Sequence, residues 1–425
     1  MDIKNRVHVK FNQVSAKYQP YFSRPVYKFI RDILFGILCS GHVHLSKIGA
    51  VLREESSLKK TTERLSKQLG REGLDQALSR VHLEVNRRSF AQAHYLIVDL
   101  SDITKPYAEK MEGLGRVYDG STGELSNGYW QLNIIGVDQS GSAIMPMFSS
   151  LYATDREGGK GFSENKKILE SVDVVSESLD KKQIVVFDRG GDRGKLIYHW
   201  LKEKQHFIIR QTGERNIYCR DEQINLRDLA VRIRLRHMIT VDKRRGNRIR
   251  KRTFRVGARQ VYMPKPYAPG HLDQSLWLVS AKEPGKGWSW YLCFIPAASE
   301  YEAVHTCMQG YGYRWKIEEV HRQVKSEYHL EHICLRRYTA LKNFNVLFWM
   351  AMSFVYQHLE GISIDIMQYA KVKLVYRSRK LKEYLDFVYY KLARALKVIL
   401  LEIKLRKLKL GSPASNPDQL GLLFE

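Results

Sequence analysis

The feature that most limits the possible folds is a set of short apolar runs that begins near residue 95. HYLIVDL (94–100), QIVVF (183–187) and HFIIRQ (206–211) are too short for typical helices and rich in β-branched residues. Such runs are typical of buried strands. A helical pattern at 164–179 precedes the second run, and another at 193–204 lies between the second run and the third. Strands that alternate with helices in this way predict an α/β fold with helices packed on a sheet.

Two further strands are expected between the first run and the first of these helices. Tyr129–Val137 and Ala143–Phe148 are apolar segments joined by Asp138–Gly141, a hairpin turn. The glycine-rich stretch 111–128 before them reads as a loop. Ser163 is expected to cap the helix that follows. The resulting order, β-β-β-α-β-α-β, implies a mixed sheet rather than a purely parallel one.

Two of the predicted strands end on a carboxylate. Asp99 closes the first apolar run, and Asp188 follows QIVVF. Because strands that finish at the same edge of a sheet bring their ends together, we expect the two side chains to lie close to each other. Asp102 competes with Asp99 for this role. Asp99 is preferred because it directly ends the run, whereas Asp102 is expected in the following loop.

A third acid lies in the stretch 311–325, YGYRWKIEEVHRQVK. If this stretch is one helix, Tyr311, Arg314, Glu318 and Lys325 project within an arc of roughly 60°. A core-facing stripe is apolar and an exposed helix scatters its charges. One aromatic, two cations and one carboxylate instead suit a surface that holds phosphates and a metal ion. A solvated basic helix is the alternative interpretation.

Asp99, Asp188 and Glu318 together predict a metal site. Clustered carboxylates repel one another unless a cation lies between them, and oxygen ligands select hard ions such as Mg²⁺ or Mn²⁺. Two such ions can activate a water or a 3′-hydroxyl on one side of a phosphodiester and stabilise the leaving oxygen on the other. Each acid alone could equally be a strand cap or a surface charge.

The charge balance points to a polyanionic partner. The chain has 425 residues with 70 Lys and Arg against 45 Asp and Glu, a formal net charge of +25. Nucleic acid is the first candidate partner, and an anionic membrane surface is the second. Five scattered cysteines without a C-x2-C pair indicate neither disulfides nor a zinc site and suit a reducing cytoplasm. The sequence shows no signal peptide and no apolar run long enough to span a bilayer, so an intracellular protein is expected.

The chain divides into five expected regions. Residues 1–90 read as short helices, compatible with a helix-turn-helix DNA reader, although any small helical bundle would give the same pattern. Residues 91–211 form the first part of the core. Residues 212–299 form a β-rich insertion. Residues 300–340 complete the core with the 311–325 helix. Residues 341–425 are basic and helical, with helices at 344–359 and 371–410 and a disordered tail after 411.

The insertion contains a basic hairpin and two tryptophans. Alternating segments at 231–236 and 249–256 are expected as its strands, with Arg244 and Arg245 near the turn and facing DNA. Further strands are expected at 277–280 and 288–294. The second of these carries Trp288 and Trp290. An insertion of this length is too long for an ordinary loop, so we expect a unit with its own function or core.

These residues carry a resemblance to a known family. The order of strands, the two aspartates and the glutamate beyond a β insertion resemble the RNase-H-like DDE transposases. The spacing Tyr311-x2-Arg314-x3-Glu318-x6-Lys325 is similar to the Y-x2-R-x3-E-x6-K signature of the insertion-sequence-four family of bacterial transposases, which includes the transposon-five enzyme. FDRGGDRG around Asp188 is similar to the family's second-aspartate segment. The resemblance covers about residues 90–340.

The resemblance implies a site and a reaction. Asp99, Asp188 and Glu318 would bind two Mg²⁺ ions, with Mn²⁺ as a substitute, and Tyr311, Arg314 and Lys325 would contact phosphates of the transposon ends. Trp288 or Trp290 would stack on a flipped base while the DNA end forms a hairpin, although a core role for either is open. The reaction would be nicking at the terminal inverted repeats, hairpin formation and opening, and strand transfer by the 3′-hydroxyl into target DNA. Two ends cut together require at least a homodimer, acting on double-stranded DNA in a prokaryotic cytoplasm at the nucleoid.

Two alternatives stay open. One is an RNase-H-like nuclease that cuts without joining, which has less need for the Tyr, Arg and Lys around Glu318. The other is a transposase-derived DNA-binding protein without catalysis, which has no need for all three acids. Detection of strand transfer separates the first alternative from a transposase, and metal-dependent cleavage separates the second.

Overall fold

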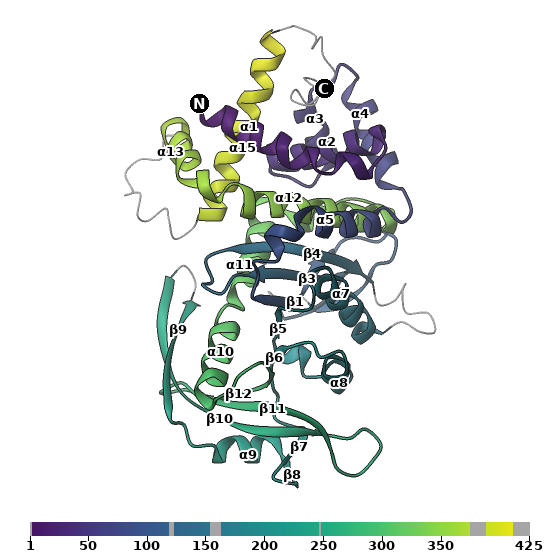
Figure 1. Ribbon diagram of the computed structural model, residues 1–425. Coiled ribbons are helices and arrows are strands. Elements are labelled where there is room, and N and C mark those ends of the chain that lie inside the picture. The colour runs from purple at the N-terminus through teal and green to yellow at the C-terminus, as the bar shows by residue number, and fades with distance from the viewer. Residues whose placement is uncertain (1, 119–122, 154–162, 246–247, 375–387, 411–425) are drawn as a thin grey trace.

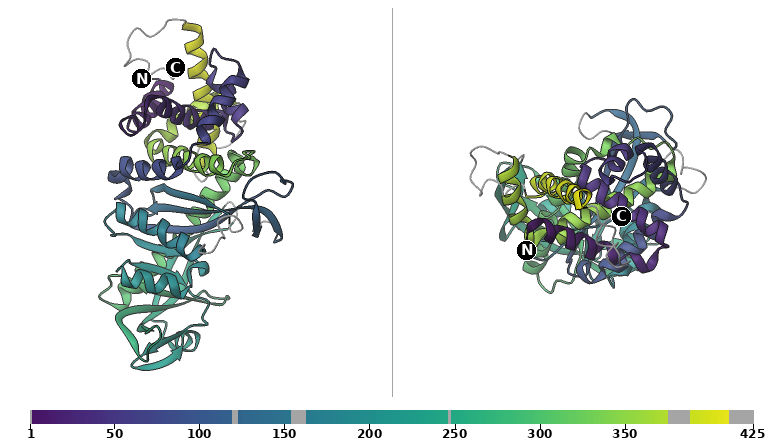
Figure 2. Two further views of the ribbon diagram at one scale, coloured as in Figure 1. Left: turned by 90° about the vertical axis from the view of Figure 1, so that its right-hand side faces the viewer. Right: turned by 90° about the horizontal axis from the view of Figure 1, so that it is seen from above.

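The computed structural model describes residues 2–118, 123–153, 163–245, 248–374 and 388–410. Helices from both ends of the chain gather at one end of an elongated molecule (Figures 1 and 2). The central sheet lies in the middle, and the β-rich region 212–299 forms the opposite end. The mixed α/β fold with flanking helices is therefore confirmed, and it is consistent with an RNase-H-like core.

The N-terminal region is helical, as expected. Its elements are α1 (Ile3–Ala16), η1 (Gln19–Tyr21), α2 (Arg24–Ser40), α3 (Leu45–Leu52), α4 (Leu58–Leu69) and α5 (Leu74–Phe90). Helix α2 ends at Gly41, whose φ of 62° is a left-handed conformation that glycine adopts without a Cβ clash. Most of α2 is buried, because it packs against α3 and against two C-terminal helices, α12 (Tyr338–Ser353) and α15 (Val388–Leu410).

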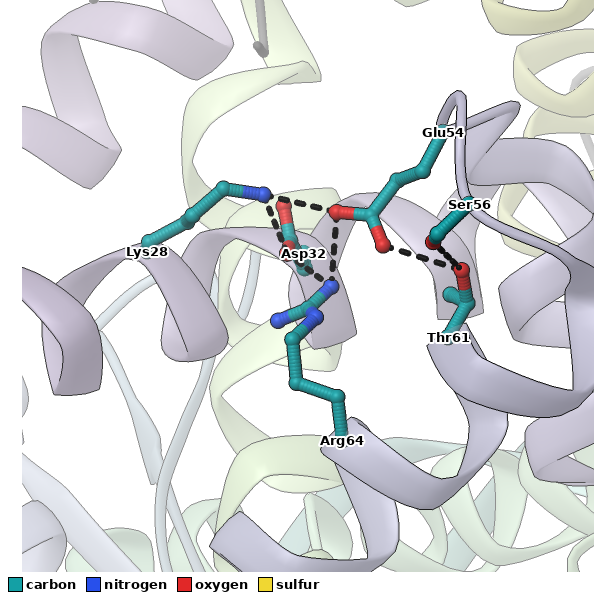
Figure 3. A network of polar contacts seen from close by, with 6 residues as sticks. All are labelled: Lys28, Asp32, Glu54, Ser56, Thr61 and Arg64. Carbon is teal, nitrogen blue, oxygen red and sulfur yellow. Dashed lines mark hydrogen bonds and ion pairs between the residues drawn. The ribbon is translucent and has the colours of Figure 1, made fainter.

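A network of ion pairs joins α2, the segment after α3, and α4 (Figure 3). Lys28 and Arg64 both contact Asp32 and Glu54, at 2.7–3.3 Å. Thr61 also donates to Glu54, over 3.0 Å. Burial raises the pKa of Asp32, while the two cations oppose that rise. Two cations facing two acids compensate one another, so charged side chains can lie between packed helices.

Within the described residues, six strands, two α-helices and one short 3₁₀-helix make the first part of the core. They are β1 (Tyr95–Thr104), β2 (Gly115–Tyr118), β3 (Leu125–Val137), β4 (Ile144–Tyr152), α7 (Glu164–Ser178), β5 (Ile184–Phe187), η2 (Arg189–Gly191), α8 (Gly194–Lys202) and β6 (Phe207–Arg210). Strand β1 pairs with β3 antiparallel and with β5 parallel, and β5 pairs with β6 parallel. The β3–β4 hairpin is confirmed, and the expected order of strands and helices is found with one strand more, β2.

Three expectations for this region were wrong in detail. The stretch 111–128 is not all loop, because β2 and the start of β3 lie in it and pair with each other. Strand β1 does not end at Asp99 but runs on to Thr104, since β3 pairs with it along its full length. Asp102 therefore lies in the strand as well. Ser163 precedes α7 without a side-chain capping hydrogen bond.

The region 212–299 extends the same sheet. Its elements are β7 (Asn216–Cys219), β8 (Glu222–Asn225), α9 (Leu226–Arg232), β9 (His237–Arg245), β10 (Arg248–Pro264), β11 (His271–Lys282) and β12 (Trp288–Phe294). Strand β12 pairs antiparallel with β6, which gives one 12-stranded sheet across the described residues. The strand expected at 231–236 is wrong. Helix α9, capped by the Asn225 side chain, covers its beginning, and the hairpin arm starts only at His237.

The stretch 311–325 is not one helix. Helix α10 (Glu300–Gly312) ends before Arg314, and α11 (Trp315–Glu327) begins after it. At the break the N–H of Arg314 donates to the carbonyl of Tyr311 over 3.1 Å, and that of Lys316 to Tyr313 over 3.0 Å. These i→i+3 bonds tighten the turn and rotate the residues on either side relative to each other. Tyr311 thus lies on a different helix from Glu318 and Lys325.

The described part of the C-terminal region is mostly helical. Its elements are η3 (Leu330–His332), α12 (Tyr338–Ser353), the π-helical turn η4 (Phe354–His358), η5 (Glu360–Ile362), α13 (Ser363–Leu374) and α15 (Val388–Leu410). The single helix expected over 371–410 is represented by parts of α13 and α15, and the residues between them lie outside the described part. So does the tail expected after 411.

A test of length and apolar character finds no single described helix able to cross a membrane. Helices α2 and α3 pass it only as a pair bent by 98°.

Candidate active site

Two of the three predicted acids lie near the end of the β1–β5 contact. In the parallel register Ile184 faces Tyr95 and Val186 faces Ile97, the last pair of the two strands. Asp99 lies two residues further along β1, and the negative charge of Asp188 is close enough to raise its pKa. Asp188 follows β5 directly and caps η2, since its Oδ1 accepts from the Gly190 N–H over 2.7 Å. A Cβ at Gly190 would lie 3.0 Å from this same oxygen, which explains a glycine in the turn.

Arg314 lies between Asp99 and Glu318. Its Nη1 is 3.8 Å from Asp99 Oδ1, and its Nη2 donates to Glu318 Oε1. Burial raises the pKa of Asp99 to about 7, and Arg314 opposes that rise. The negative charges of Asp188 and Glu318 raise the same pKa further. The structure therefore brings the three acids within electrostatic reach of one another, with a guanidinium among them.

Lys325 and Tyr311, the other two residues of the predicted stripe, have separate partners. Lys325 Nζ is 3.1 Å from Asp102 Oδ2 and 3.0 Å from Glu331 Oε1. Burial lowers the pKa of Lys325, but these two carboxylates reverse that and raise it above its ordinary value. The ring of Tyr311 lies 4.7 Å from that of Tyr291 on β12. Asp102 is thus the partner of Lys325 and is separate from the pair formed by Asp99 and Asp188.

His321 is a neighbour of the acids that the sequence pattern did not single out. Its Nδ1 is 3.7 Å from Asp99 Oδ2, and its Nε2 is 2.9 Å from the side-chain amide of Asn133. Burial lowers the pKa of His321 to about 3, and Lys325 and Arg314 add to the effect. The ring is therefore neutral near pH 7. The sequence could have predicted this position, because His321 lies three residues after Glu318 and therefore on a similar face of α11.

A cleft of about 450 Å³ opens beside the acids. It lies between the β9–β10 hairpin, β12 and the α10–α11 break, and Arg314 and Glu318 line it. Cations and aromatic rings make up much of the remaining wall: Arg189, Arg210, Lys286, Trp288, Tyr311 and Trp315. A basic wall with interleaved aromatic rings suits a nucleic acid strand, whose phosphates pair with cations and whose bases stack on rings.

The structure separates the two candidate tryptophans. Trp288 lines the cleft, and Lys282 Nζ lies 5.0 Å from the centre of its ring. Trp290 packs elsewhere, with Arg227 at 5.5 Å, and a Cβ at Gly213 would lie 2.8 Å from its ring. Arg244 and Arg245 belong to β9 and pair through their backbones with β10. Their side chains lie outside the described part.

The donor chemistry of the three acids fits a hard divalent cation, because all of their side-chain donors are carboxylate oxygens. Their present arrangement does not yet form a closed ligand set. Among the described residues no three His, Cys, Asp or Glu side chains are placed to hold a metal ion. At this site the Arg314 guanidinium lies at two of the acids, since it donates to Glu318 and faces Asp99.

A mixed sheet that carries acids next to a basic, aromatic-lined cleft is consistent with the RNase-H-like class of nucleic acid enzymes. Residues 161–354 match the family model of the transposase DDE domain. The matched stretch includes Asp188, Glu318 and the break between α10 and α11, and it begins after Asp99. The match supports a DDE-type transposase acting in DNA transposition and recombination. A comparison with curated proteins gave no match.

Proposed function

We propose that this protein is a cut-and-paste transposase that binds the terminal inverted repeats of an insertion sequence, cleaves its ends and joins the 3′-hydroxyls to target DNA. The observation that carries the proposal is the position of Asp99 on β1 and of Asp188 directly after its parallel neighbour β5, with Glu318 in electrostatic reach and a basic cleft alongside. A finer assignment, to the insertion-sequence-four family and its transposon-five member, rests on the Tyr311–Lys325 spacing and is part of the proposal.

In this proposal Asp99, Asp188 and Glu318 hold two Mg²⁺ ions, for which Mn²⁺ can substitute. Such ions polarise the scissile phosphate and lower the pKa of an attacking water or hydroxyl. The role of Arg314 follows from its two contacts. It neutralises the acids in the free protein and is transferred to a DNA phosphate when an end enters the cleft, which frees Glu318. Arg is suited to this exchange because its guanidinium binds carboxylate and phosphate in the same forked geometry.

The DNA end is proposed to lie along the cleft. Tyr311 and Lys325 would contact phosphates on either side of the acids, and Trp288 rather than Trp290 would stack on a flipped base in a hairpin intermediate, since Trp288 lines the cleft. Arg244 and Arg245, on the hairpin that borders the cleft, would follow the DNA backbone. The proposal also keeps the division of the chain into regions 1–90, 91–211, 212–299, 300–340 and 341–425. The first region would read DNA and the last would form the dimer interface. The protein would act at the bacterial nucleoid.

Nicking of supercoiled plasmid with Mn²⁺ tests this function. Glu318→Ala and Asp188→Ala are each expected to lower the rate roughly a hundredfold or more, the scale seen when a stabiliser of transition-state charge is removed. DNA binding should be largely retained, because neither acid is a phosphate contact. Glu319→Ala, the adjacent acid on α11, is the matched control and should cut normally. Wild-type cutting by Glu318→Ala would refute its role.

The same assay addresses the alternatives once the DNA ends are supplied. Cleavage without joined products would indicate a nuclease. Binding without cleavage would indicate a transposase-derived DNA-binding protein.

A further inference from the structure

His321 lies beside the acids with a side chain that is 12% exposed, and the proposed function gives it no task. The two oxygens of Asp99 face different neighbours: Oδ1 faces Arg314, at 3.8 Å, and Oδ2 faces His321 Nδ1, at 3.7 Å. The Arg314 contact ends if that side chain moves to a DNA phosphate. The His321 contact does not depend on such a move, because the Nε2 atom on the other side of the ring is hydrogen-bonded to Asn133.

The support behind His321 is a chain of buried amides. Its Nε2 meets Asn133 Nδ2 at 2.9 Å, and the same amide donates to Gln131 Oε1 over 3.0 Å. Gln131 in turn donates to Asn345 over 2.5 Å, and Asn345 to Ser149 Oγ over 2.8 Å. All four supporting residues are buried. They connect β3, β4 and α12, so the chain is anchored in three elements.

The direction of these bonds orients the ring. An amide NH₂ group can only donate, so His321 Nε2 accepts from Asn133. The proton of the neutral imidazole is therefore on Nδ1, which faces Asp99 Oδ2. At 3.7 Å the two atoms are too far apart for a hydrogen bond. A small rotation of the Asp99 carboxylate, once Arg314 has left its other oxygen, would close that gap.

We propose that His321 is a positioning residue that orients the Asp99 carboxylate for metal binding when Arg314 is engaged by DNA. This inference rests on the proposed function, because it takes Asp99 as a ligand. Under this proposal the buried chain of Asn133, Gln131, Asn345 and Ser149 fixes the tautomer and the ring orientation of His321. Groups that orient a metal ligand in this way usually affect metal affinity by ten- to a hundredfold.

Two substitutions separate positioning from mere packing. His321→Asn places an amide where Nδ1 lies and keeps a donor toward Asp99. His321→Gln reaches further and replaces Nε2, which keeps the contact to Asn133 but not the donor. Gln323→Leu is the matched control: Gln323 is buried on the same helix and accepts a hydrogen bond from Tyr356, away from the acids.

The measurement is Mn²⁺ binding to the full chain, followed by loss of the free-ion EPR signal, with Arg314→Met present in every protein compared, including the one that is wild type at 321, so that no guanidinium faces Asp99. His321→Gln is expected to raise the half-saturating Mn²⁺ concentration about tenfold or more, while His321→Asn and Gln323→Leu stay near wild type. Asn133→Ser, which removes the support but leaves the ring, should weaken binding in the same direction. Equal effects of His321→Asn and His321→Gln, or wild-type binding by both, would overturn the proposal. Wild-type Mn²⁺ binding by Asp99→Ala would instead show that the acid site itself is wrongly assigned.

Discussion

The contacts of Arg314 imply that the free protein uses this side chain as a built-in counter-ion. Two unit charges 3.8 Å apart attract by about 4 kcal/mol at an effective dielectric constant near 20, before any cost of desolvation. The Glu318 side chain is 48% exposed, so solvent screens its share, whereas that of Asp99 is 15% exposed. We therefore expect Arg314→Met to lower the free energy of unfolding by about 2 kcal/mol in the absence of metal, less than the 3–5 kcal/mol of a fully buried pair.

The assay is urea unfolding, followed by circular dichroism, in EDTA and in Mn²⁺. A divalent cation supplies the positive charge that the substitution removed, so Mn²⁺ should stabilise Arg314→Met more than it stabilises the wild type. An ion present at a hundred times its dissociation constant adds about 2.7 kcal/mol, enough to cancel the loss. Arg322→Met is the control, because Arg322 is exposed on the same helix.

The reasoning would be refuted in either of two ways. If Arg314→Met is as stable as the wild type in EDTA, then Arg314 does not compensate the acids. If it is destabilised equally in EDTA and in Mn²⁺, then the loss comes from packing and no cation site is exposed.

Two further predictions concern the parts of the fold that support the site. A Cβ at Gly310 would lie 2.6 Å from the Tyr95 ring, so Gly310→Ala should push α10 off the sheet, cost roughly 1–3 kcal/mol in thermal unfolding and slow cleavage. Gly287→Ala meets no atom within 4 Å, and a change as large there would contradict this account. Burial lowers the pKa of His82 to about 4, below its unfolded value of about 6.5. The stability that this neutral ring contributes is present above pH 6.5 and lost as the pH falls to 4, roughly 3 kcal/mol in all. Urea titrations across that range should show the loss, and His82→Gln should flatten it; an unchanged slope would rule His82 out as the cause.

The core could be predicted because its signals are local. The apolar run QIVVF by itself predicts a strand, and Asp188 follows this strand directly in the sequence, so its place does not depend on distant contacts. The β3–β4 hairpin is likewise specified by its own residues. The end of β1 could not be read in this way. Beyond Ile97 this strand has lost its β5 partner and pairs on one side only, so polar residues such as Asp99 and Asp102 remain within it.

The break between α10 and α11 was missed for a related reason. Helical periodicity continues through Tyr313 and Arg314, and only the i→i+3 bonds show that the turn is tightened. The strand predicted at 231–236 was wrong for a different reason. Its residues alternate strictly, but the helix that begins after Asn225 extends into this segment because it buries Leu229 and Ala230.

The side-chain partners within the site depend on distant parts of the chain. Arg314 and Lys325 were expected to meet phosphates, and in the structure each also meets an acid that lies more than two hundred residues earlier, Asp99 and Asp102 respectively. No pattern within the stretch 311–325 contains that information. The same holds for His321, whose supporting amides come from β3 and α12.

The order of the elements along the chain also sets an order of assembly. Asp99 on β1 and Asp188 just after β5 belong to two strands that pair directly, whereas Glu318 lies on α11, which follows β12 in the chain. Because synthesis runs from the N-terminus, both aspartates emerge from the ribosome before the glutamate has been made. Under the proposed roles, a nascent or prematurely terminated chain has two of the three acids and cannot cut the DNA that encodes it.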